Sequence, residues 1–182
     1  MLEVKVGEKE LFDESTGEFV YVKPTILKLE HSLISLSKWE SKWHKPFLEN
    51  EGMMTEEEFL DYVRCMTIMQ NVDNNVYLCL TKINILEIKA YMNEPMTATW
   101  FNEKQNMPKS KQRAITAELI YYWMIALGIP EKCEKWHLNR LLTLVRVCNI
   151  ENSPKKKMKK NDILRQNASI NQARKKLSNS KG

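Results

Sequence analysis

Three histidines, His31, His44 and His137, are the first side chains in this sequence that could bind a metal ion or act as a general base. Metal-binding and catalytic histidines commonly occur at spacings such as HxH, HExxH or HxxxH, and none of these is present. The acidic run Glu56–Glu58 could supply paired carboxylates, but it directly follows Thr55, and acidic residues are typical of the first turn of a helix. Packed or surface histidines and a helix start therefore explain these residues without any chemistry.

The cysteines and glycines also give no sign of a reactive or phosphate-binding site. Cys65, Cys79, Cys133 and Cys148 include no CxxC pair, and most of them lie among apolar residues. Reduced, packed thiols are therefore expected rather than disulfides or zinc ligands. The five glycines are not clustered, which excludes a GxGxxG or Walker loop. The sequence thus predicts no catalytic residue, no cofactor and no metal, in a protein that is not an enzyme.

Six large aromatic side chains are harder to assign to packing alone. Aromatic residues at helical spacing are usually core residues, yet tryptophan is also enriched at the dominant positions of protein interfaces. Both interpretations stay open at this stage, and solvent exposure decides between them. The residues concerned are Trp39, Trp43, Trp100, Phe101, Trp123 and Trp136.

The first thirty residues have the pattern of β-strands. Residues 2–6 (LEVKV) alternate between apolar and charged side chains, as a half-buried strand does. Two β-prone runs then surround residues 13–17, a loop ending in glycine that is typical of a hairpin. Pro24 interrupts the pattern, and residues 25–31 predict a third strand.

A helical period begins at Ser32. The first predicted helix starts there and ends before Pro46. The next starts at Thr55, where Glu58 completes a capping box. One face of the first helix carries Leu33, Leu36, Glu40 and Trp43. The apolar stripe of the second is formed by Phe59, Tyr62, Val63, Met66 and Met69.

A third helix is predicted to begin at Thr81 and to stop before Pro95. Residues 76–80 (VYLCL) are ambiguous between a strand and a helical turn, and residues 95–101 (PMTATWF) are β-prone. The apolar residues that define the third helix are Ile83, Leu86 and Ala90.

Residues 119–129 form eleven consecutive positions without a charge. A helix that is apolar all round must be buried on every side, by its own domain or by a partner. Eleven residues are too few to cross a bilayer, which needs about 20. We expect Thr116 to cap this helix, Gly128 to end it and Pro130 to open a second helix packed antiparallel to the first. The face of the second helix is Leu138, Leu141, Leu142, Val145 and Cys148.

The charge is distributed unevenly. Residues 151–182 contain ten Lys or Arg and two Asp or Glu, which gives +8, so the remaining 150 residues carry −3. The segment has a thin apolar stripe, and we expect residues 155–182 to order only on a partner or a neighbouring subunit. No aromatic residue lies among the lysines after Ser153, which disfavours base stacking and hence nucleic-acid binding.

Strands followed by helices predict an α+β fold. The expected organisation is a small N-terminal antiparallel sheet or hairpin in residues 1–31, a mainly helical body in 32–150 and a basic, partly flexible C-terminal helix in 151–182. The charged N-terminus has no apolar stretch typical of a secretory signal, and no membrane association is expected.

Several strings resemble a family of small proteins encoded in the tail-morphogenesis genes of tailed bacteriophages, the tail assembly chaperones. The resemblance covers most of residues 30–182, including the basic ending. The strings are EHSLISLSKWESKW (30–43), DYVRCMT (61–67), VYLCLT (76–81), PMTATWF (95–101), ITAELIYYWMIALGIP (115–130) and KWHLNRLLTLVRVCN (135–149).

The resemblance implies a factor that acts in the cytoplasm of the infected bacterium. It would bind the helical tape-measure protein and other tail proteins, keep the tape measure soluble and assist tail-tube polymerisation. Two alternatives stay open: a structural tail or baseplate component of the virion, and a small nucleic-acid-binding regulator acting through the basic tail. A homo-oligomer is also left open. The residues expected to bind a partner are Trp39, Trp43, Trp100, Phe101, Trp136, Arg140 and Arg146.

Overall fold

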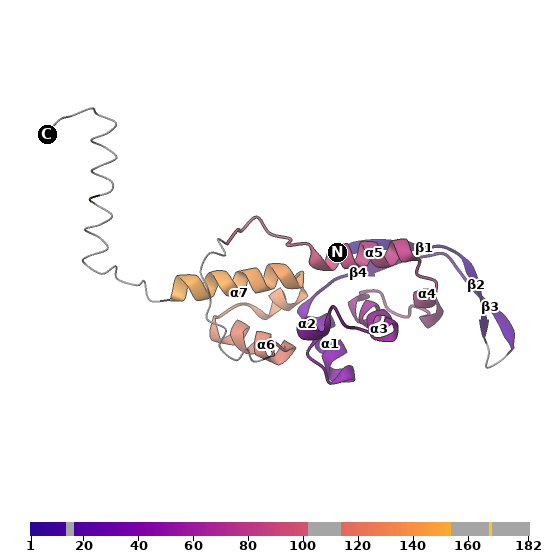
Figure 1. Cartoon of the computed structure of the whole chain (residues 1–182), viewed down its shortest axis with the longest axis horizontal. Coiled ribbons are helices and arrows are strands. Elements are labelled where there is room, and N and C mark those ends of the chain that lie inside the picture. Colours follow the sequence, from indigo (N-terminus) through magenta and orange to yellow (C-terminus); the bar gives the residue numbers. More distant parts are fainter. Residues whose placement is uncertain (14–16, 102–113, 154–167, 169–182) are drawn as a thin grey trace, which may run out of the picture. The chain divides into compact units, whose positions relative to one another are not determined.

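The computed structural model describes residues 1–13, 17–101, 114–153 and 168. The chain divides into two units, Met1–Asn149 and Ile150–Gly182. The predicted basic C-terminal helix lies almost entirely outside the described residues. The first unit has the predicted α+β class, an N-terminal antiparallel sheet followed by a mainly helical body (Figure 1).

The N-terminal strands form two separate two-stranded sheets. Strand β1 (Leu2–Val6) pairs antiparallel with β4 (Thr25–Leu29), and β2 (Lys9–Asp13) pairs antiparallel with β3 (Glu18–Val22). The predicted hairpin is therefore confirmed. Figure 1 shows β2 and β3, here called the arm, projecting from one end of the unit.

The β1–β4 sheet covers the core with one face. Val4 and Val6 of β1 and Leu27 and Leu29 of β4 are buried, whereas the residues between them are more exposed. This alternation follows from the two-residue repeat of a strand. The apolar positions in the sequence therefore set which face of the sheet points inward.

Seven α-helices and one 3-10 helix follow among the described residues. They are α1 (Leu33–Trp43), α2 (Phe47–Asn50), α3 (Glu56–Met66), α4 (Asn74–Leu78), α5 (Lys82–Asn93), α6 (Ala117–Ala126), the 3-10 helix η1 (Glu131–Lys135) and α7 (Leu138–Asn152).

The predicted helix starts are confirmed at three positions. Ser32 caps α1, and Thr55 and Thr81 cap α3 and α5 through complete capping boxes with Glu58 and Asn84. In each capping box the cap side chain accepts a hydrogen bond from the third backbone N–H, and the third side chain accepts one from the cap residue. Local sequence alone therefore determines where these helices begin.

Three predictions about the middle of the chain are wrong or only partly right. Residues 95–101 form no strand, because Met96 has a φ of 50° and the chain turns there. Helix α5 forms, but Ile83, Leu86 and Ala90 are exposed, and its buried residues are Ile88, Tyr91 and Met92. In the ambiguous segment 76–80, residues 76–78 are helical and belong to α4, which ends at Leu78.

Two details of the later helices also differ from prediction. Met69 is not part of the α3 stripe, because α3 ends at Met66 and Met69 is partly exposed. Gly128 has a φ of 64° after α6, as predicted. Pro130, however, opens η1, and α7 begins only at Leu138. The connection between α6 and α7 is therefore longer than expected for a second helix that begins at Pro130.

Glu40 links three helices through one buried carboxylate. It lies on α1, and its Oε1 accepts a 2.7 Å hydrogen bond from the backbone N–H of Phe47 at the start of α2. Its Oε2 accepts a 2.7 Å hydrogen bond from the backbone N–H of Ala117 at the start of α6. Neither α2 nor α6 has a side-chain cap from its own N-cap residue, Pro46 or Thr116. The predicted Thr116 position is right, but Glu40 supplies the hydrogen bond.

We predict that Glu40→Ala lowers the free energy of unfolding by about 2–4 kcal/mol, because hydrogen bonds to a charged group each contribute roughly 1.5–3 kcal/mol and removing the carboxylate relieves part of its desolvation. Glu40→Gln should cost less, since a carboxamide keeps a single acceptor oxygen. Urea denaturation measures both. Glu49→Ala on α2 is the control, because Glu49 is exposed. An effect of Glu40→Ala no larger than that of the control contradicts the prediction.

Candidate functional site

Trp39, the first predicted partner-binding residue, lies wholly in the core. It has no exposed surface, and its indole N–H donates a 2.9 Å hydrogen bond to the carbonyl of Glu58. Its ring lies edge-on to Phe47, with 5.3 Å between centroids. Trp39 therefore offers no surface to a partner in this conformation, and packing explains it.

Trp43 is half-buried at the end of α1, where its surroundings are already paired. Its indole N–H donates to the carboxylate of Asp61 at 2.9 Å. The ammonium groups of Lys42 and Lys45 lie 5.7 and 5.8 Å from its ring centroid. Lys42 also pairs with Asp61, and Lys45 with Glu58. The hydrogen bond from Lys45 holds the pKa of Glu58 below its usual value. The charges around Trp43 are therefore satisfied within the chain.

Four of the predicted residues form two arginine–aromatic pairs on α7. The guanidinium carbon of Arg140 lies 4.2 Å from the ring centroid of Trp136, and that of Arg146 lies 4.0 Å from the ring centroid of Phe101. Both arginines are exposed. The two arginines are separated by roughly 9 Å along the helix axis. The structure therefore brings the predicted residues together as pairs.

Hydrogen bonds from Asn139 connect α7 to the chain at the start of segment 94–101. The side-chain amide of Asn139 donates to the carbonyls of Met92 and Glu94, at 2.9 Å each. Trp100 follows in this segment and is 92% exposed, so it is unlike the buried Trp39. Trp100 is the predicted residue with the largest freely accessible aromatic surface.

Apart from Glu118 in its first turn, helix α6 is apolar, but only one of its faces is covered. Ala117, Ile120 and Met124 are buried, whereas Tyr122 is 63% and Ile125 is 80% exposed. The described residues do not bury this helix on every side, so the expected alternative of burial by a partner stays open. We call the exposed side, Tyr122 and Ile125, the outer face of α6.

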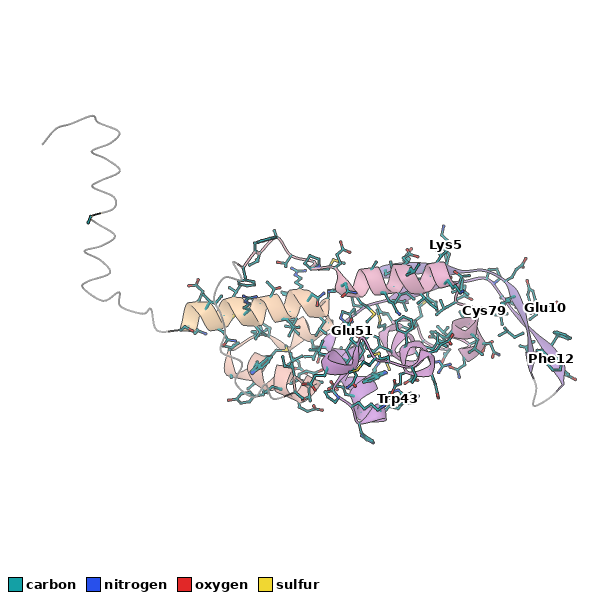
Figure 2. The ribbon with its side chains drawn as sticks, in the orientation of Figure 1. Lys5, Glu10, Phe12, Trp43, Glu51 and Cys79 are labelled. Atoms are coloured by element: carbon teal, nitrogen blue, oxygen red, sulfur yellow. The ribbon has the colours of Figure 1, made fainter. Side chains whose placement is uncertain are left out.

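The arm also exposes aromatic side chains, which the sequence analysis did not single out. Phe12 and Phe19 lie opposite each other, and Tyr21 follows two residues later on the same face. Figure 2 labels Glu10 and Phe12 on this projection. The sequence did contain a signal for this aromatic face: Phe19 and Tyr21 alternate in residues 18–22 (EFVYV), and the hairpin aligns Phe12 with Phe19. Aligned positions in a hairpin share one face.

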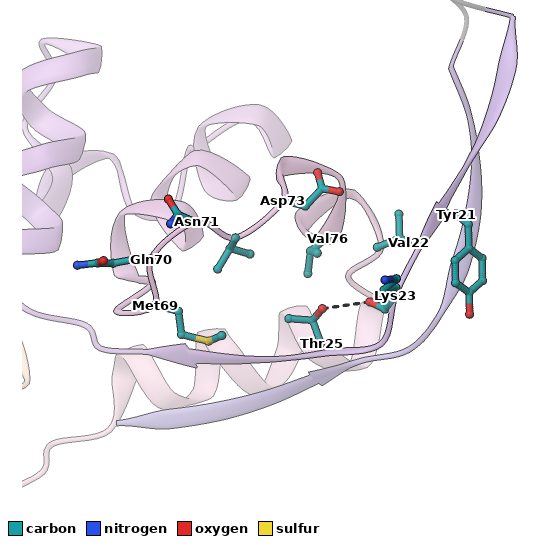
Figure 3. Close-up of a pocket in the computed structure, with 10 residues that line it drawn as sticks. Tyr21, Val22, Lys23, Thr25, Met69, Gln70, Asn71, Asp73 and Val76 are labelled. Carbon is teal, nitrogen blue, oxygen red and sulfur yellow. Dashed lines mark hydrogen bonds between the residues drawn. The ribbon is translucent and has the colours of Figure 1, made fainter.

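Two open pockets complete the surface. One, of about 350 Å³, lies at the base of the arm between the end of β3 and the turn around Asn71 (Figure 3). The other, of about 470 Å³, is lined mainly by Leu48, Met54, Phe59 and Met92. Neither holds a grouping of nucleophile and base.

Two buried histidines that are far apart in the sequence form the cluster that most resembles a catalytic or metal-binding site. The rings of His31 and His137 lie 5.1 Å apart between centroids. Nδ1 of His31 shares a 2.5 Å hydrogen bond with the hydroxyl of Tyr62. Nε2 of His137 donates to the carbonyl of Tyr91 at 3.0 Å, which leaves its buried Nδ1 without a partner among the described residues.

Both imidazoles are held neutral by their surroundings. Burial, reinforced by His137, lowers the pKa of His31 to about 3. Burial also lowers the pKa of His137, although the hydrogen bond to the carbonyl of Tyr91 and the carboxylate of Glu30 act in the opposite direction. The pair therefore connects the β4–α1 junction to the start of α7 as part of the core.

No group of three or more His, Cys, Asp or Glu in the described part of the chain could hold a metal ion. Comparison with protein-family models, curated proteins and solved structures finds no match to this chain. The exposed surfaces and the resemblance in the sequence are therefore the features that bear on function.

We predict that the histidine pair makes the fold sensitive to mild acid. The pKa of histidine in an unfolded chain is about 6.5, and both folded values are lower. Below pH 6.5 the unfolded chain therefore binds more protons, and the free energy of unfolding falls by up to about 2.7 kcal/mol per pH unit for two such groups.

Urea denaturation between pH 7 and pH 5 tests this dependence. His31→Leu should reduce the slope by about half, because one of two titrating groups is removed. His44→Asn is the control: His44 is exposed and has a φ of 53°, which asparagine tolerates. An unchanged slope in His31→Leu would show that the pair does not control stability.

Proposed function

We propose that this protein is a non-enzymatic assembly chaperone that binds the tape-measure protein of a tailed bacteriophage and assists polymerisation of the tail tube in the infected cell. The outer face of α6 is the observation that carries the proposal. Tyr122 and Ile125 lie exposed on a helix with no charge between Leu119 and Ile129. Such a face fits the apolar stripe of an amphipathic partner helix.

The resemblance to tail assembly chaperones supports the same proposal from the sequence. One of the segments that resemble the family, residues 115–130, contains α6. No helix in the described residues is long and apolar enough to cross a membrane. We propose a protein partner on the outer face of α6.

We predict that Ile125→Glu weakens binding to the tape-measure protein at least about tenfold, because burying an isoleucine side chain contributes about 1.5–3 kcal/mol and a buried unpaired carboxylate is unfavourable. Co-expression with the tape-measure protein and affinity purification measure the soluble complex. Ile83→Glu is a matched control, since Ile83 is 76% exposed on α5 and Ile125 is 80% exposed on α6. Equal recovery with both variants contradicts the proposed site.

Mass spectrometry of purified phage particles separates a chaperone from a virion component. A chaperone is released once the tail is complete, so the protein should be absent or far below one copy per tail-tube ring. Stoichiometric presence in mature tails would reject the chaperone function and favour the structural alternative.

A further inference from the structure

One face of the arm is both aromatic and acidic. Phe12, Phe19 and Tyr21 share this face and are 56%, 71% and 53% exposed. The rings of Phe12 and Phe19 are 5.2 Å apart between centroids. Glu10 lies opposite Tyr21, and the hydroxyl of Tyr21 donates to the carboxylate of Glu8. A two-stranded sheet has no second layer to bury such a face, and alone it is only marginally stable.

Charges that lack partners occur both on the arm and on α7. In the described residues no basic group lies within ion-pair distance of Glu8 or Glu10, and no carboxylate lies within that distance of Arg140 or Arg146. The basic groups around Trp43 differ in this respect, because Asp61 and Glu58 neutralise them. The arm and the α7 arginines are therefore complementary in charge.

Two simpler ways of covering the arm are disfavoured. Pairing of two arms would place acidic strands side by side, and like charges directly opposite each other are destabilising. Within one copy the arm and α7 lie at opposite ends of the unit Met1–Asn149, as Figure 1 shows. The arm therefore needs the α7 surface of another molecule.

We propose that the arm of one copy docks on the two arginine–aromatic pairs of α7 in a second copy. Phe19 and Tyr21 would stack on the free side of guanidinium groups that already lie over Trp136 and Phe101. The carboxylate of Glu10 would accept hydrogen bonds from the N–H groups of an arginine, since a guanidinium has five N–H donors and binds carboxylates in a fixed geometry. This inference goes beyond the proposed function, because it concerns self-association and not the tape measure.

The contact is heterologous, since the two surfaces that meet are different. Each dimer therefore keeps one free arm and one free α7 surface, and further copies add to it head to tail. Exposed charge pairs are individually weak and are screened by salt. The association should therefore rise continuously with protein concentration and fall with ionic strength.

Sedimentation velocity of the full chain between about 5 and about 200 µM tests the proposal, since small polar interfaces associate in that range. The arm variant is Glu8→Lys with Glu10→Lys, which changes the carboxylate bonded to Tyr21 and the one opposite it. The α7 variant is Arg140→Glu with Arg146→Glu. Each alone should associate at least about tenfold more weakly, because like charges then face each other. An equimolar mixture should recover association, because each arm then meets an α7 surface of opposite charge.

The control variant, Glu49→Lys with Glu87→Lys, has the same change in net charge as the arm variant but alters exposed residues on α2 and α5. It should associate like the parent. Far-UV circular dichroism verifies that every variant is folded. Three results would each overturn the proposal: a parent that stays monomeric throughout, a loss of association with the arm variant but not the α7 variant, or a mixture that stays monomeric.

Discussion

The buried carboxylate of Glu40 is the interaction on which the helical body depends. A short helix such as α2 has few backbone hydrogen bonds of its own, and its first residue follows a proline that cannot cap it. Helix α6 starts 77 residues after Glu40 in the sequence and also lacks a side-chain cap. One acceptor group on α1 therefore fixes the start of both helices, and the direction in which α6 presents its outer face follows from it.

A second set of contacts fixes α7 in the same way. The backbone N–H of Leu138, the first residue of α7, donates a 2.7 Å hydrogen bond to the carbonyl of His31. The isolated bridge between Ser32 and His137 and the contact between the two histidine rings reinforce this junction. Because the start of α7 is held at the β4–α1 junction, its arginines are carried on a rigid element and not on a free loop.

Local patterns in the sequence determine the elements that are correctly predicted. Alternation in residues 2–6 and the capping signatures at Thr55 and Thr81 depend only on neighbouring residues, so they can be read without knowledge of the fold. The buried face of α5 could not be predicted in this way, because its apolar residues at 83, 85, 86 and 88 are compatible with more than one buried side. For α6 the charged Glu118 lies on the exposed side with Tyr122 and Ile125, but the uncharged residues after it give no further sign of which side is exposed.

The candidate surfaces show the same limit. Trp136 lies just before α7 and close in sequence to Arg140, whereas Phe101 and Arg146 are far apart in sequence and meet only through the folded chain. Burial separates Trp39 from Trp100, and residue type alone does not predict which of the two is exposed.

The exposed surfaces differ in the physical force that each can offer a partner. The outer face of α6 carries one charge, Glu118, in line with Tyr122 and Ile125. Binding there therefore depends mainly on buried apolar area and should change less with salt than binding at the arm. The arm and the α7 arginines combine aromatic rings with unpaired charges, so their contacts are weakened by salt and are readily reversible. Because α6, the arm and α7 are separate elements, an apolar partner on α6 and a second copy on the other two surfaces need not compete for the same side chains.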